Sequence, residues 1–199
     1  MMRALDAVMV RANGLRSLTP GAAGCGEHGL RIRPRRLRRP VRLTGAVLPA
    51  GALVIDLHLC NQRDPDAASR EGAARWAARL LVRYRRSCRE IARQMLEDPE
   101  LARAAGVGGV SAIFGGAGGH GGAGRLPVHL GFEVLPHPAP LGAFGTFFQR
   151  LYAWGLLAAY APGSLAGRHL AELGFIEIWM TREAFLDRFA PTRPSTPPA

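Results

Sequence analysis

The stretch that decides the fold is VIDLHLCNQRDP, residues 54–65. Its first half is a short apolar run rich in β-branched residues and leucine, which is typical of a strand. Asp64 can then accept hydrogen bonds from the free N–H groups of a helix start, and Pro65 fits the first helical position. The sequence therefore predicts a central strand over 53–59, a turn from Asn61 to Asp64, and a helix that begins at Pro65.

Alternation along this strand separates its polar side chains from its apolar ones. Asp56, His58 and Cys60 fall on one face, and Asn61 stands at the strand end. These polar residues have two interpretations: a small enzyme with a polar site at Asp56, His58 and Asn61, or a structural His58 bonded to backbone or to a carboxylate. The opposite face is predicted to enter the core through Leu53, Ile55, Leu57 and Leu59.

The helix after this turn is predicted to run from 65 to 97. Apolar residues recur along it every three or four positions, which is the period of one helix face, while arginines fall on the other side. Asp98-Pro99 repeats the start signal for a short helix that ends at Gly106. The predicted apolar face consists of Trp76, Leu80, Tyr84, Cys88, Ile91 and Met95.

The remaining segments complete an α+β fold, with a small, mostly antiparallel sheet packed against the long amphipathic helix and a second apolar helix. Pro34 and Pro40 should confine the basic strands around them to short or edge pieces. The second helix is expected to be a buried core helix.

The domains are predicted as an N-terminal helix and Gly-rich loop at 1–28, one α+β domain at 29–190 and a disordered Pro-rich tail at 191–199. Further strands are expected near 30–33, 41–43, 110–114, 132–134 and 174–180, and further helices at 143–161 and 181–189.

Charge is the second strong feature of the chain. The net charge is +11, and all 26 basic residues are Arg. Seven of them lie between residues 31 and 42, which makes Arg35, Arg36, Arg38 and Arg39 candidates for polyanion binding. A solvated Arg surface that reflects genome composition is the alternative. Since the first aromatic residue, Trp76, lies well beyond this cluster, any nucleic-acid binding should not be sequence-specific.

Several chemistries are excluded or disfavoured. The absence of Lys excludes a Walker phosphate loop and a Lys Schiff base. The glycines of 115–124 satisfy a dinucleotide fingerprint in more than one register, which favours a flexible loop. Three cysteines without repeating spacing argue against a disulfide framework. No cofactor and no metal are predicted, and the apolar run at 151–161 is too short to span a bilayer.

The order of three segments resembles the YkoP-like family. RPVRLTGAVLPAGALVIDLHLCNQ (39–62) is similar to the start of that family, where a basic strand and a turn lead to a Leu-His-Leu-x-Asn strand end. HLGFEV (129–134) and IEIWMTREAFLDRF (176–189) resemble its Leu-Gly-Phe-Glu-Val segment and its Trp-containing C-terminal strand and helix. The glycines at 115–124 and Ala52 depart from the pattern.

The resemblance implies a small bacterial α+β domain that is sometimes attached to polysaccharide deacetylases. It implies no catalytic residue. On this basis we expect a non-enzymatic accessory or binding module linked to cell-envelope polysaccharide, with an anionic surface, a polysaccharide or an envelope enzyme as its partner. The expected location is cytoplasmic, with peripheral attachment at the inner membrane face as the alternative.

Overall fold

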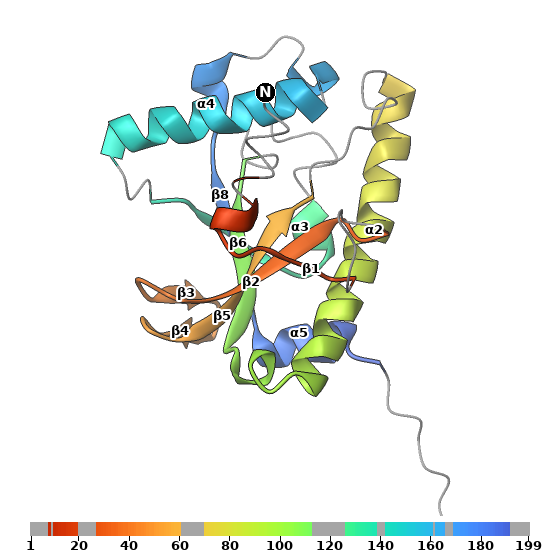
Figure 1. Ribbon diagram of the computed structural model, residues 1–199, viewed down its shortest axis with the longest axis vertical. Helices are drawn as coiled ribbons and strands as arrows, with labels where there is room; N and C mark the ends of the chain where they lie inside the picture. Colours follow the sequence, from red (N-terminus) through yellow and green to blue (C-terminus); the bar gives the residue numbers. More distant parts are fainter. Residues whose placement is uncertain are drawn as a thin grey trace, which may run out of the picture.

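Figure 1 presents the computed structural model of the chain, in which a twisted sheet is flanked by one long helix. The structure describes residues 8, 10–19, 27–60, 70–112, 126–138, 142–160, 162–165 and 169–191. Its strands are β1 (Arg16–Ser17), β2 (Leu30–Arg36), β3 (Val41–Leu43), β4 (Ala46–Leu48), β5 (Leu53–Leu59), β6 (Gly106–Ser111), β7 (Glu133–Pro136) and β8 (Ile176–Thr181). Its α-helices are α2 (Arg70–Glu97), α3 (Leu126–His129), α4 (Gly142–Tyr160) and α5 (Arg182–Phe189), and its 3-10 helices are η2 (Leu101–Arg103), η4 (Pro162–Leu165) and η5 (Leu170–Glu172).

The main sheet has six strands in the order β1-β2-β5-β6-β8-β7, and β3 and β4 form a separate hairpin. Among the strands that the structure describes, β5 and β6 pair in parallel and the other pairs are antiparallel. A parallel pair requires a crossover, and α2 supplies it. The α+β prediction with a mostly antiparallel sheet is confirmed. Because β1 pairs with β2, the sheet begins before residue 29, where the sequence analysis placed the domain boundary.

The core lies between one face of this sheet and the helices α2 and α5. Ile55 and Leu57 are buried there as predicted, Leu59 packs against them from its rim, and Leu53 stays outside this cluster. The side chain of Trp76 and the predicted helix start at Asp64 lie outside the described residues. The predicted face of α2 contributes Tyr84, Cys88, Ile91 and Met95, and α5 adds Phe185 and Phe189.

Three local predictions are corrected. The strand expected at 110–114 is β6, which begins at Gly106 and ends at Ser111. The short helix expected after Asp98-Pro99 is only η2. β2 runs through Pro34 although it is an inner strand. It can do so because β1 pairs only with Arg31 and Ile32, which leaves the outer side of β2 open at the proline.

The second apolar helix exists, but the expectation that it is a buried core helix is wrong. α4 contains no buried residue. It lies across one end of the molecule, at the top of Figure 1, while α2 and α5 occupy the apolar face of the sheet. No described helix combines the length and the hydrophobicity that crossing a membrane demands.

Candidate functional site

The candidate site is the sheet face that turns away from α2, called here the polar face. Backbone register places Arg33, Asp56, Gly108 and Trp179 opposite one another on four neighbouring strands. Since side chains alternate along a strand, His58 and Glu177 share this face. It carries two buried carboxylates, Asp56 and Glu177, each 5% exposed. Burying a charge requires compensating partners, and each carboxylate has its own set.

Asp56 is held by three cationic or potentially cationic groups on one carboxylate oxygen. Its Oδ2 lies 2.7 Å from a terminal guanidinium nitrogen of Arg33, 3.0 Å from Nε of Arg35 and 3.0 Å from Nε2 of His58. Arg33 also donates to the side-chain oxygen of Asn13 at 3.1 Å. The sequence alternative of a structural His58 bonded to a carboxylate therefore agrees with this geometry.

This environment sets the protonation of Asp56. Burial alone would raise the pKa of its carboxyl, but the hydrogen bond and charge of His58 and the charge of Arg35 outweigh burial and lower the pKa from 3.8 to about 2. A carboxylate with so low a pKa is a weak base near neutral pH. Asp56 is thus an ionised anchor for its neighbours.

Glu177 forms a second cluster of the same kind. Its Oε1 lies 2.6 Å from a guanidinium nitrogen of Arg39 and 3.0 Å from Nδ1 of His137, and its Oε2 accepts a hydrogen bond from Nε1 of Trp179 at 3.1 Å. Burial raises the pKa of Glu177, while the hydrogen bonds from His137, Trp179 and Arg39 lower it, and the net shift is downward. Sequence reasoning missed this cluster because Arg39 and Glu177 stand 138 positions apart.

Trp179 joins the two clusters. The guanidinium carbon of Arg35 lies 5.7 Å from the centroid of its ring, within cation–π range. The indole covers Gly108 so closely that a Cβ at that glycine would come within 2.3 Å of the ring. The absence of a side chain at Gly108 therefore allows the Trp179 ring to pack against β6, between the Asp56 and Glu177 clusters.

The predicted polyanion residues divide into occupied and free arginines. Arg35 and Arg39 are committed to the buried carboxylates. Arg36 donates to the carbonyl of Gly51 at 2.9 Å. Arg38 is exposed and has no hydrogen bond or ion pair with any residue the structure describes. The segment 31–42 thus builds part of the fold and still presents cations to solvent.

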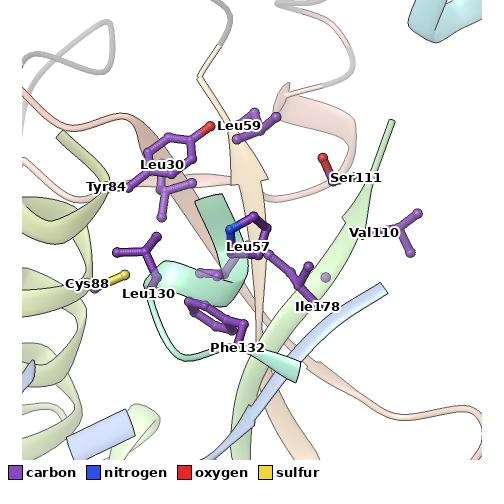
Figure 2. Close-up of a pocket in the computed structure, with 12 residues that line it drawn as sticks. Leu30, Leu57, Leu59, Tyr84, Cys88, Val110, Ser111, Leu130, Phe132 and Ile178 are labelled. Carbon is purple, nitrogen blue, oxygen red and sulfur yellow. The ribbon is translucent and has the colours of Figure 1, made fainter. Parts of the chain in front are cut away.

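A small cavity lies on the opposite, core-facing side of the sheet. Its volume is about 30 Å³, and its lining is apolar apart from the Ser111 and Tyr84 hydroxyls. Figure 2 shows Leu57, Leu130 and Phe132 closing it between the sheet and α2. This space is sufficient for a water molecule or two. Since Asp56 and His58 point to the other face, the cavity is not a substrate pocket for them.

One predicted site residue and two further polar residues remain to be located relative to the polar face. Asn61 lies outside the described residues. His129 is exposed on α3. Glu133 stands opposite Trp179 in the register of β7 and β8, so it shares the polar face, where it accepts hydrogen bonds from the backbone N–H and hydroxyl of Thr44. Within the described ranges, no group of three or more His, Cys, Asp or Glu residues could hold a metal ion.

The cysteines depart from the sequence expectation in one respect. Cys88 is a free, buried thiol whose pKa burial raises to about 12, so it is inert as a nucleophile. Cys60 is disulfide-bonded, although the spacing of the three cysteines argued against a disulfide framework. Its partner lies outside the described residues.

Comparison with known proteins gives no assignment for this arrangement. No protein-family model matches the chain, and no curated protein or solved structure is significantly similar to it.

Proposed function

We propose that the protein is a non-catalytic accessory or binding module linked to cell-envelope polysaccharide metabolism. The main support for this proposal is that both buried carboxylates are already paired with arginine and histidine side chains. Asp56 and Glu177 are each bonded to arginine and histidine, and the pKa of each carboxyl is lowered. A general acid or base at neutral pH would need the opposite shift for a carboxyl group. The link to polysaccharide is supported only by the YkoP-like resemblance.

The test measures ligand-dependent melting shifts of the full chain across envelope oligosaccharides and nucleotides, together with turnover of polysaccharides. We expect a stabilising oligosaccharide and no turnover. His58→Ala should lower the free energy of unfolding by about 1 kcal/mol, because it removes one hydrogen bond to the Asp56 carboxylate, which remains paired with Arg33 and Arg35. It should leave the ligand-dependent shift intact. Turnover that disappears in His58→Ala would overturn the proposal, as would lost ligand binding at unchanged stability.

A small enzyme with its site around Asp56, His58 and Asn61 is the second candidate. One observation favours it: the His58 side chain is 33% exposed, so its ring can be reached from solvent. The pairing of Asp56 with His58 could orient the ring for proton transfer. The same assays distinguish the two candidates, since this one requires turnover that falls with His58→Ala and Asp56→Asn.

Polyanion binding through segment 31–42 is the third candidate, favoured by the exposed Arg36 and Arg38. Binding to double-stranded DNA or polyphosphate should fall steeply as salt increases, because each neutralised phosphate releases counterions. Arg36→Gln/Arg38→Gln should weaken this binding at a nearly unchanged melting temperature, since the contact of Arg36 with the Gly51 carbonyl is a single exposed hydrogen bond. Absence of binding at low ionic strength would leave the cluster as a solvated surface.

A further inference from the structure

α4 presents an apolar stripe to solvent. Phe144, Phe147, Phe148 and Leu151 are 77%, 50%, 49% and 47% exposed. Their spacing of i, i+3, i+4 and i+7 places all four on one side of the helix. Large apolar side chains scattered singly on a surface are ordinary, but a contiguous patch marks an interaction surface.

The stripe is contiguous by ring contacts. The rings of Phe144 and Phe148 have centroids 4.8 Å apart, and those of Phe147 and Phe148 are 5.5 Å apart, both edge to face. The three rings therefore form one aromatic cluster. The other side of α4 is attached to the domain, since Nε of Arg150 donates to the carbonyl of Leu173 at 2.9 Å. The cluster is thus held outward on an anchored helix.

Charge indicates which kind of surface the stripe meets. α4 contains no Asp or Glu, and its one charged residue is Arg150. The whole chain carries +11. Two copies of so basic a chain repel one another, whereas an anionic surface attracts the chain. Peripheral membrane helices insert Phe or Leu while basic residues attract the anionic headgroups. Here Arg150 is the one basic residue of the helix, and the rest of the positive charge lies elsewhere in the chain.

We propose that α4 attaches the protein peripherally to an anionic lipid bilayer, with Phe144, Phe147, Phe148 and Leu151 inserted at the headgroup–acyl boundary. The arginines of the chain supply long-range attraction, and the aromatic cluster supplies the apolar contact. This surface is separate from the polar face and does not depend on the function proposed for it.

The experiment is co-sedimentation of the full chain with vesicles of phosphatidylcholine containing phosphatidylglycerol, and with vesicles of phosphatidylcholine alone. We expect binding to the anionic vesicles and at least tenfold weaker binding to the neutral ones. Phe144→Ser/Phe147→Ser/Phe148→Ser should reduce anionic binding at least tenfold at unchanged melting temperature. The matched control Val82→Ser/Leu96→Ser removes exposed apolar side chains from α2, which are 63% and 54% exposed, and should bind as the wild type does.

Three outcomes would overturn the proposal. One is no binding of the wild type to anionic vesicles. Another is equal binding by the triple Phe variant, which would mean that arginine charge alone causes the binding. In that case, loss of binding in Arg36→Gln/Arg38→Gln with the stripe intact would identify the arginines responsible. The third is a wild-type chain that binds no vesicles but forms a concentration-dependent dimer in sedimentation equilibrium, where the triple Phe variant stays monomeric. This result would assign the stripe to contact with a second copy of the chain.

Discussion

The two faces of the main sheet bury their side chains through different kinds of interaction. The core face is closed mainly by apolar contacts among β2, β5, β6, α2 and α5, and these apolar side chains need no charged partner. The polar face buries Asp56 and Glu177, and each is compensated by named arginines and histidines. Hydrophobic contacts can be exchanged among residues of similar size, whereas a buried charge depends on each of its partners. Mutations on the two faces should therefore differ in size and in pH dependence.

The largest effect is expected on the core face. Leu57→Ala removes a side chain that is 7% exposed and packed in the main cluster. It should lower the free energy of unfolding by about 2–5 kcal/mol at any pH between 5 and 8, because lost burial and a cavity add together. Urea denaturation at two pH values measures this. A loss below about 1 kcal/mol would mean that the site collapses around the gap.

Gly108→Ala should be the most damaging small change on the polar face. A Cβ there would lie 2.2 Å from the carbonyl oxygen of Ile178 and 2.3 Å from the Trp179 ring. Overpacking of this kind costs about 1–3 kcal/mol, and contact with backbone places the variant at the upper end. Thermal denaturation gives the loss, and a red-shifted Trp emission would report displacement of the indole. Unchanged stability would show that β6 and β8 can separate without cost.

Asp56→Asn tests the electrostatic part of the comparison. The pKa of Asp56 is depressed from 3.8 to about 2, so its ionised form stabilises the folded chain above pH 4, and this contribution is lost as the pH falls from about 4 to 2. The shift corresponds to about 2 kcal/mol. Wild type and variant should differ most at pH 5–7 and converge near pH 2 in chemical denaturation. A constant difference over that range would contradict the depressed pKa. Leu57→Ala serves as the control without such a titration.

The smallest effect comes from a matched pair on one strand. Val110 is 40% exposed on the polar face, and Val107 is fully buried on the core face. Val110→Thr should change stability by less than about 0.5 kcal/mol, since its hydroxyl meets water. Val107→Thr should cost about 1–3 kcal/mol, because it buries an unpaired hydroxyl. Equal losses of stability in the two variants, measured by urea denaturation, would mean that Val110 and Val107 are equally shielded from water.

Local sequence signals predicted the elements well where one period dominated. Three predictions appear in the structure: the strand at 53–59, the apolar face of α2 from Leu80 to Met95, and the capping of α5 by Thr181, whose hydroxyl accepts from the N–H of Ala184. The strand at 110–114 was misplaced because glycines at 106, 108 and 109 hide a strand from propensity. These glycines are required by close packing, which only the neighbouring strand reveals.

The candidate site was half predictable. Alternation placed Asp56 and His58 on one face, and a carboxylate partner for His58 was one of the expected alternatives. The second cluster could not be found, because nothing near Glu177 in the sequence indicates Arg39 or His137. α4 was misjudged for a related reason: its apolar composition indicates a helix that avoids water, but not what covers it.

By itself, the sequence determined where most of the elements lie and which side of β5 and of α2 is apolar. Both follow from interactions between residues a few positions apart, through hydrogen-bond geometry, capping and the periods of helix and strand. Only the tertiary structure decided the parallel pairing of β5 with β6, the union of Asp56 and Glu177 with their cations around Trp179, and the exposure of α4. These depend on contacts between residues far apart in the chain, whose free energies no local pattern encodes.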